Sequence, residues 1–229
     1  MTPAVLHPTT IPRLQNGDTL DADEFMRRYE AMPDVKKAEL IEAVVYIMSS
    51  PLRADVHGDP HADLLLWLGT YRLLTPNVRV SDNATVRLGR RNVPQPDASL
   101  RIVRGGRSTL DASGYIEGGP ELLAEVAASS VSIDRNAKFR AYRDQGVREY
   151  VLWRVEEGEI DWFFLRDGQY VALPPREDSI LHSEVFPGLW LDPAAMARLD
   201  AARVHEVLLQ GIASPEHADF VERMRQVIP

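Results

Sequence analysis

The chain has 229 residues, 45% of them hydrophobic, which is enough for one large domain or for a domain with an appendage. The absence of cysteine excludes disulfides, thiolate zinc sites and a cysteine nucleophile. The net charge of −8 argues against a non-specific, high-affinity nucleic-acid binder, which would usually be basic. No stretch approaches the roughly 20 apolar residues that span a membrane. The first residues lack the features of a signal peptide, so we expect a cytoplasmic protein.

The amino-terminal part predicts an arm, a helix and a strand or hairpin. Residues 1–19 are rich in Pro and Thr without any period, which is typical of an extended arm. Asp21 and Glu24 have the spacing of a capping box, so we expect a helix that ends before Pro33. Residues 37–48 mix apolar and β-branched types and predict a strand or a hairpin.

The middle of the chain alternates between helix and short strands. Ser49-Ser50-Pro51 breaks the preceding strand, and residues 55–74 show apolar side chains at helical spacing. Short strands are expected at 78–80, 84–88 and 97–103.

The next segment predicts a loop followed by buried strands. Residues 105–120 carry glycine pairs at both ends and predict a loop, which is a candidate lid or substrate-facing loop. A buried strand at 121–127 is followed by a helix at 133–145. Strands at 149–153 and 160–165 are expected to pair as a hairpin.

Two helices, at 193–210 and 215–227, complete the expected elements. The order of helices and strands indicates a mixed α/β or α+β sheet with helices on its faces.

Two carboxylates in strand-like apolar runs are the most informative feature. Asp97 opens one run and Glu125 lies inside another, where it shares a strand face with Leu123 and Ala127. A charge there is costly to bury unless it is paired or holds a cation. Two acids on adjacent strands would repel each other unless a hard divalent metal lay between them. The alternative is a structural ion pair between a buried acid and an arginine.

Lys138 and Glu39 are candidates to complete this set. Lys138 either stabilises the developing charge on a phosphate or makes a surface pair with Asp134, and helix geometry alone favours the surface pair. Glu39, at the edge of an apolar run, is a candidate third metal ligand. Glu42 would face the opposite way in a regular strand, so we expect one of these two acids to be solvated.

Histidines, serines and arginines give weaker signals. His57 and His61 are spaced i,i+4 without a zinc-protease pattern, so His57 is expected at the rim of the site and His61 on the helix surface. Ser129 and Ser130 have no histidine near them in sequence, which gives a serine hydrolase little support. Seven arginines crowd one stretch and as a group are expected to supply phosphate contacts: Arg79, Arg87, Arg90, Arg91, Arg101, Arg104 and Arg107.

Several short stretches together match one family in order and spacing. They are Glu39-Leu40-Ile41, the helix start at His57, Gln95-Pro96-Asp97, Pro120 to Val126, Ser129-Ser130, and the series Asp134, Lys138, Tyr142 and Gly146 to Tyr150. With them the chain resembles the Uma2 family of endonuclease-like proteins, within the PD-(D/E)xK nuclease superfamily.

The resemblance covers roughly residues 20–195. It implies a restriction-endonuclease-like mixed β-sheet flanked by helices, preceded by the arm at 1–19 and followed by a helical appendage at 196–229. It also implies that Asp97 and Glu125 bind Mg²⁺ or Mn²⁺. The acid–x–lysine pattern of the superfamily would place a lysine at position 127, where this chain has alanine, and Lys138 on the following helix would take its role.

The expected function is therefore metal-dependent hydrolysis of DNA phosphodiester bonds, with Asp97, Glu125, Lys138 and Glu39 as the catalytic set. The alternative is a catalytically inactive module of the same fold that serves binding or assembly. The apolar residues Phe186, Leu189 and Trp190 could then serve a homodimer, although a place in the core is the simpler expectation. A hydrolase of small phosphoesters is the third possibility.

Overall fold

The computed structural model describes residues 11–48, 51, 53–128, 131–176 and 178–227. The first ten residues of the expected arm, the break at Ser49-Ser50 and the Ser129-Ser130 pair lie outside the described residues. No helix within the described ranges is long and apolar enough to cross a membrane.

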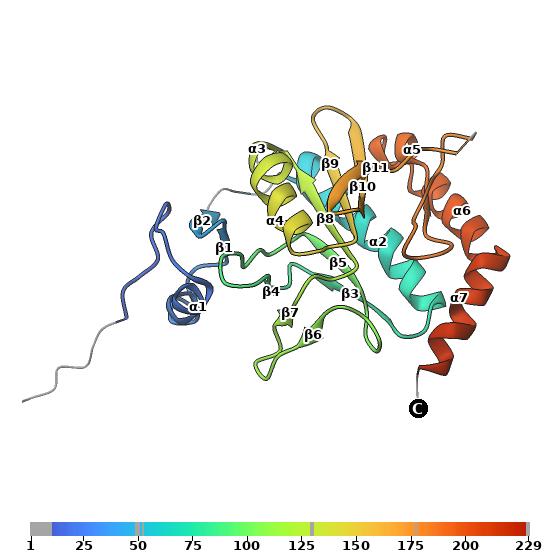
Figure 1. Ribbon diagram of the computed structural model, residues 1–229. Coiled ribbons are helices and arrows are strands. Elements are labelled where there is room, and N and C mark those ends of the chain that lie inside the picture. The colour runs from blue at the N-terminus through green and yellow to red at the C-terminus, as the bar shows by residue number, and fades with distance from the viewer. Residues whose placement is uncertain (1–10, 49–50, 52, 129–130, 177, 228–229) are drawn as a thin grey trace, which may run out of the picture.

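A six-stranded mixed sheet forms the centre of the molecule (Figure 1). Its strands are, in spatial order, β11 (Gln169–Ala172), β10 (Glu159–Arg166), β9 (Glu149–Arg154), β8 (Leu122–Ala127), β5 (Ala98–Ile102) and β3 (Val78–Asp82). Neighbours pair antiparallel except β8 and β9, which run parallel. The predicted mixed sheet, with the 149–153 and 160–165 strands as a hairpin, is therefore confirmed.

Side chains of β8 alternate between two apolar layers. Leu122, Ala124 and Val126 face the larger core, which they share with α2 and the carboxyl-terminal helices. Leu123 and Ala127 face a second core on the other side of the sheet, and Glu125 lies between them. The sequence prediction of this alternation is confirmed, because a strand turns successive side chains to opposite faces.

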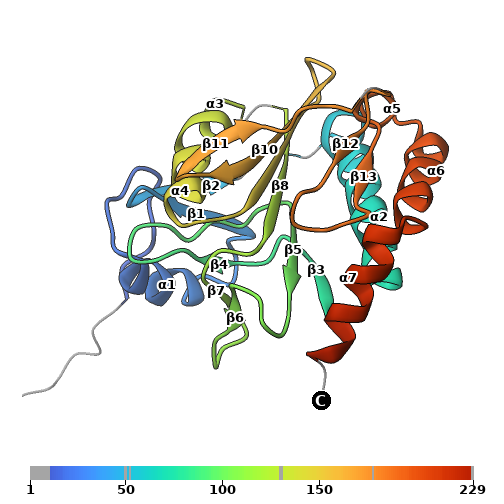
Figure 2. The same cartoon turned by 45° about the vertical axis from the view of Figure 1, so that its right-hand side comes forward.

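The amino-terminal elements form a small layer with its own core (Figure 2). Helix α1 (Ala22–Glu30) begins at the cap Asp21, whose side chain accepts from the backbone N–H of Glu24. Strands β1 (Lys37–Ile41) and β2 (Val44–Met48) form the expected hairpin.

The long helix α2 (Asp59–Leu74) packs on the larger core and is preceded by a π-helical turn, η1 (Ala54–Gly58). The expected helix from residue 55 is confirmed, but its first turn is wider than an α-helical turn. Pro60 follows that turn and has no N–H with which to continue the regular ladder.

The crossover between β8 and β9 is helical over residues 131–144, as predicted. It consists of α3 (Val131–Ile133), the π-helical turn η2 (Asp134–Lys138) and α4 (Phe139–Asp144). Gly146 follows with a φ of 73°, a conformation that suits glycine at the end of a helix. This crossover covers the face of the sheet on which Glu125 lies.

The structure corrects the prediction of a continuous loop at 105–120. It contains two short strands, β6 (Thr109–Leu110) and β7 (Ile116–Glu117), which join β4 (Val86–Arg87) in a three-stranded sheet. Ile116 is buried in the second core, so the segment is anchored rather than placed as a lid.

The carboxyl-terminal part adds a strand pair, β12 (Leu181–His182) and β13 (Trp190–Leu191), and three helices, α5 (Pro193–Ala197), α6 (Ala201–Ile212) and α7 (Pro215–Gln226). The first of the two expected helices is interrupted at Leu199, which has a φ of 57°. Phe186 and Leu189 are fully buried in the larger core, as the simpler expectation had it.

Candidate active site

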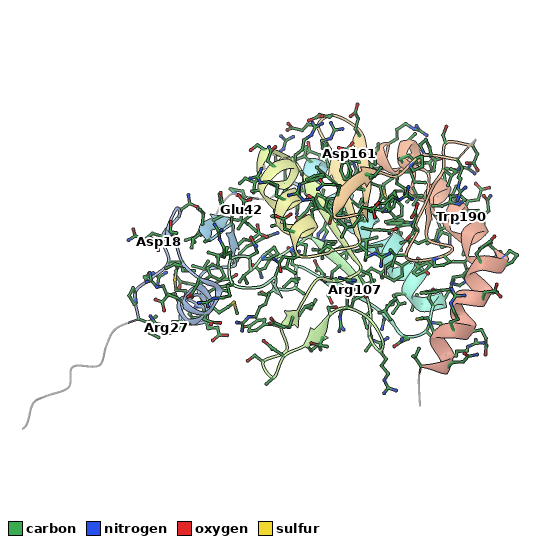
Figure 3. The ribbon with its side chains drawn as sticks, viewed as in Figure 1. Asp18, Arg27, Glu42, Arg107, Asp161 and Trp190 are labelled. Atoms are coloured by element: carbon green, nitrogen blue, oxygen red, sulfur yellow. The ribbon has the colours of Figure 1, made fainter. Side chains whose placement is uncertain are left out.

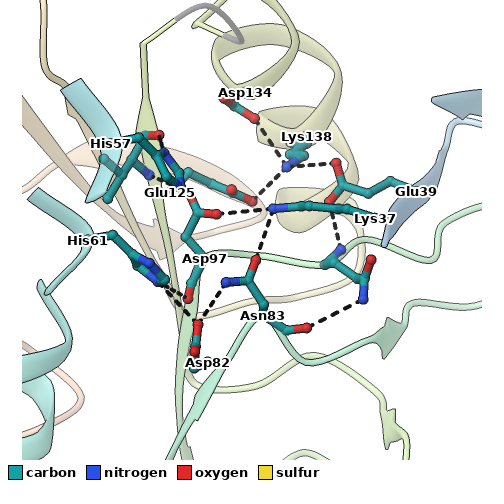
Figure 4. A network of polar contacts seen from close by, with 12 residues as sticks. Lys37, Glu39, His57, His61, Asp82, Asn83, Asp97, Glu125, Asp134 and Lys138 are labelled. Carbon is teal, nitrogen blue, oxygen red and sulfur yellow. Dashed lines mark hydrogen bonds and ion pairs between the residues drawn. The ribbon is translucent and has the colours of Figure 1, made fainter. Parts of the chain in front are cut away.

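Asp97 and Glu125 meet at one end of two neighbouring strands. Ala98 of β5 pairs with Ala124 of β8, so the two acids are adjacent on the same face of the sheet. Both line a pocket of about 520 Å³. The convergence of these acids, which come from different parts of the chain, provides the centre of a candidate active site (Figure 4).

Lys138 is the hub of the buried charges. Its Nζ lies 2.9 Å from Oε1 of Glu125 on β8, 3.0 Å from Oε2 of Glu39 on β1 and 3.2 Å from Oδ1 of Asp134 on its own helix. The lysine is only 2% exposed. The expectation of a surface pair is therefore wrong: the pair with Asp134 exists, but it belongs to a buried cluster.

The electrostatics of this cluster follow from its burial. Burial raises the pKa of Glu125 to about 8, although Lys138 acts in the opposite direction. Burial also works to lower the pKa of Lys138, but the surrounding carboxylates outweigh it and hold that pKa well above the usual value. Tyr142 adds a hydrogen bond of 2.7 Å from its hydroxyl to Oε1 of Glu125. Burial thus disfavours the charged form of Glu125, and the ammonium group of Lys138 offsets this only in part.

Asp97 is held by a second lysine. Lys37 Nζ lies 3.1 Å from Oδ1 of Asp97, and Oδ2 accepts a bond of 2.8 Å from the backbone N–H of Val126. Burial acts to raise the pKa of Asp97, but the positive charges of Lys37 and Lys138 outweigh it, so this pKa is lowered. Lys37 also donates to Oδ1 of Asn83 over 3.1 Å.

Lys37 is the functional candidate that the sequence predictions missed. A signal was available, because the chain has only three lysines among 26 basic residues. Two of the three, Lys37 and Lys138, line the same pocket. A lysine differs from the arginines of this chain in presenting a compact ammonium group, so the rare lysines were positions to consider.

Glu39 lies outside the pocket and contacts the site through Lys138. Its Oε1 accepts from the backbone N–H of Gln95 over 2.6 Å and its Oε2 pairs with Lys138, and it does not line the pocket. Glu42 lies in the turn of the β1–β2 hairpin (Figure 3), where it pairs with Arg140 over 2.8 Å and is partly exposed. The prediction that one of these acids is solvated is confirmed.

The two histidines brace the ends of the acid-bearing strands. His57 Nδ1 lies 3.2 Å from the carbonyl oxygen of Val126, and His61 Nε2 lies 2.9 Å from that of Asp97. Both residues line the pocket, as expected for His57. The expected surface position of His61 is wrong, because the ring packs between the helix and β5 with a side chain only 15% exposed.

None of the seven arginines of the 79–107 stretch lines the pocket. Among the described residues that do, the basic side chains besides the two histidines are Lys37, Lys138 and Arg53. The arginine group therefore does not provide phosphate contacts inside the pocket.

The chemistry of the pocket fits a divalent cation in two respects. Asp97 and Glu125 offer the oxygen donors that Mg²⁺ and Mn²⁺ prefer. The buried carboxylates also outnumber the ammonium groups, four to two: Glu39, Asp97, Glu125 and Asp134 against Lys37 and Lys138. In the part of the chain that the structure describes, no three His, Cys, Asp or Glu side chains form a ready metal site. A cation would thus bind in competition with the lysines.

A mixed sheet with paired acids at one strand end and a lysine on the crossover helix defines a protein of the nuclease fold. The chain belongs to the Uma2 family, described as "Putative restriction endonuclease", whose profile matches residues 22–194. It is similar in fold to the crystal structure of a "putative nuclease belonging to DUF820" from Anabaena variabilis. The TM-score is 0.56 at 13% identity, covering 76% of this chain and 97% of that one. No curated protein matches the chain.

Proposed function

We propose that this protein is a metal-dependent endonuclease that hydrolyses phosphodiester bonds of DNA. The observation that supports this most is the convergence of Asp97, Glu125 and Lys37 on one pocket of about 520 Å³. Family membership is consistent with the proposal. Mg²⁺ or Mn²⁺ held by Asp97 and Glu125 would lower the pKa of a water molecule and neutralise the scissile phosphate.

The two lysines have different roles in this proposal. Lys37 has a side chain 24% exposed, so its ammonium can leave Asp97 and contact a phosphate oxygen or the attacking water. Lys138 is enclosed by three carboxylates and holds Glu125 in place. Glu39 acts through Lys138, whose ammonium group it orients.

The test is nicking of supercoiled DNA by purified protein with Mg²⁺ or Mn²⁺. We expect Asp97→Asn to lower the rate by about 1,000-fold, because it removes a metal ligand and keeps the shape of the side chain. Glu149→Gln is the matched control, since it neutralises a buried acid of the same sheet that does not line the pocket. Wild-type activity that persists in excess chelator would overturn the proposal.

A further inference from the structure

Strands β3 and β5 carry a double row of polar side chains on the face that bears Asp97. Their register pairs Ser81 with Ser99 and Arg79 with Arg101. The intervening residues, such as Val78 and Leu100, face the larger core on the opposite side. The row thus leads from the pocket to a pair of arginines.

The pocket end of this row is already part of the candidate site. Asn83 follows β3, and its backbone N–H donates to the carbonyl oxygen of Asp97 over 3.3 Å. Its side chain accepts from Lys37. The two polar rows therefore join the pocket without a break in the strand pairing.

The far end of the row carries two cations without an ion pair in the described part of the chain. Arg101 is only 8% exposed, yet its Nε has no hydrogen-bond partner there. Arg79 lies directly opposite, is exposed, and donates only to the carbonyl oxygen of Val78. Twelve other arginines of the described chain have carboxylate partners: Arg13, Arg27, Arg28, Arg53, Arg87, Arg90, Arg140, Arg143, Arg154, Arg166, Arg203 and Arg225.

This arrangement is unfavourable for the protein alone. Like charges directly opposite on adjacent strands are destabilising, and a buried charge without a partner costs more. Glu121, an acid of the neighbouring strand end, attracts Arg101 without forming an ion pair with it, but burial and the charge of Arg79 outweigh this attraction and still lower the pKa of Arg101. The two carboxylate oxygens of Glu121 accept hydrogen bonds from the backbone N–H groups of Ile102 and Arg107. An anion from outside would offset both costs.

We propose that Arg79 and Arg101 form a subsite for a backbone phosphate of the DNA strand that is cleaved at Asp97 and Glu125. This inference rests on the proposed function and names where the substrate strand runs. Arg101 lies four positions along the strand from Asp97, a distance of about 13 Å. At 3.4 Å per nucleotide along a DNA strand, that corresponds to about four nucleotides. Because β3 is an edge strand of the sheet, the DNA strand can approach Arg79 from solvent.

The experiment compares two arginine variants with a control that changes the net charge equally. The variants are Arg79→Gln and Arg101→Gln, and the control is Arg72→Gln, an exposed arginine of α2 on the other side of the sheet. Binding of a labelled oligonucleotide of about 15 nucleotides is measured by fluorescence anisotropy with Ca²⁺ in place of Mg²⁺ and over a range of salt. Hydrolysis of bis(4-nitrophenyl) phosphate with Mn²⁺ reports the catalytic centre, because this substrate is too short to reach the arginines.

We expect each variant to weaken oligonucleotide binding about five- to tenfold. The slope of log affinity against log salt should fall by about one unit, as for the loss of one phosphate contact. Hydrolysis of the small substrate should not change, and Arg72→Gln should behave as the wild type in both assays. Wild-type binding in both variants, or no binding by the wild type, would overturn the inference.

Thermal unfolding provides a second readout. Arg101→Gln should not lower the melting temperature, because the arginine makes no ion pair with the residues that the structure describes. A clear fall, with intact binding in Arg79→Gln, would assign the pair to structure and overturn the inference. Arginine-dependent binding without any cleavage would sink the nuclease proposal alone. Cleavage that is unaffected in both variants would sink the subsite alone.

Discussion

Buried carboxylates at the two ends of the neighbouring strands β5, β8 and β9 are held by different kinds of partner. At the pocket end, Asp97 pairs with Lys37, and Glu125 pairs with Lys138. At the other end, Glu121 accepts two backbone N–H groups. Glu149 accepts the N–H groups of Glu184 and Val185 and the hydroxyl of Ser183.

This difference determines whether the partner of a buried acid can be replaced by a ligand. A backbone N–H is fixed by the fold, so Glu121 and Glu149 pin strand ends to the loops that cross them. The ammonium group of Lys37 is partly exposed on a flexible stem and can move aside for a metal ion or a phosphate, whereas the enclosed Lys138 stays with Glu125. The kind of partner, rather than burial alone, distinguishes Asp97 and Glu125 from Glu121 and Glu149.

The largest effect on stability is expected from Lys138→Met. The change leaves Glu39 and Glu125 without their shared cation in a buried place, which should lower the free energy of unfolding by about 3–5 kcal/mol. Urea denaturation measures it. The control is Arg140→Met on the same helix, where an exposed pair with Glu42 is lost and the change should stay below about 1 kcal/mol. Equal losses in the two variants would refute the buried hub.

Glu149→Gln tests the acid held by backbone groups. Burial raises the pKa of Glu149 from 4.5 to about 7, so the folded protein keeps this proton longer than the unfolded chain does. The stability that the group contributes is present below pH 4.5 and is lost as the pH rises through 7. The free energy of unfolding of the variant relative to the wild type should therefore increase by roughly 3 kcal/mol between pH 4 and pH 8. A difference that stays constant over this range would contradict the assignment.

Tyr142→Phe removes the hydroxyl that shares Oε1 of Glu125 with Lys138. Losing this bond leaves a buried oxygen of Glu125 with one partner fewer, which should cost about 2 kcal/mol in the same denaturation experiment. Tyr170→Phe is the control, because its hydroxyl donates to the neutral carbonyl of Val147 and should cost about 1 kcal/mol. The reverse order would mean that Glu125 does not depend on this bond.

Lys37→Met should change stability least and activity strongly. The ammonium is partly exposed, and Asp97 keeps the backbone N–H of Val126 and faces the pocket, so the loss of the lysine should cost about 1 kcal/mol. Nicking of DNA should fall roughly 100-fold, as when one donor to a developing charge is removed. A stability loss as large as that of Lys138→Met, with unchanged nicking, would exchange the roles of the two lysines.

The sequence could predict what depends on local periodicity. The alternation around Glu125 identified its face, and the i,i+4 spacing identified the contact between Asp134 and Lys138. Local spacing does not say which side of a helix meets the sheet, so the burial of Lys138 was not predictable from it. Strands of two residues, such as β6 and β7, have no period to detect.

Contacts that join distant segments were also beyond local patterns. Lys37 is 60 residues from Asp97 in sequence and 46 from Asn83, and only the docking of the β1–β2 hairpin brings them together. The arginine pair has the same origin, because the register of β3 against β5 places Arg79 opposite Arg101. The division of the chain at residue 195, the homodimer and the cellular location stay predictions.

The parallel pairing of β8 with β9 has a consequence for how related chains can diverge. Parallel neighbours require the polypeptide to travel back over the sheet, and here residues 131–144 make that return above Glu125. Inward positions of the returning segment that lie over Glu125 can deliver an amine to the same carboxylate, as Lys138 does. The lysine can therefore occupy different sequence positions in related chains while its ammonium group stays beside the same carboxylate. A search for homologues that demands acid–x–lysine overlooks such chains, whereas one that asks for an inward lysine on the return segment keeps them.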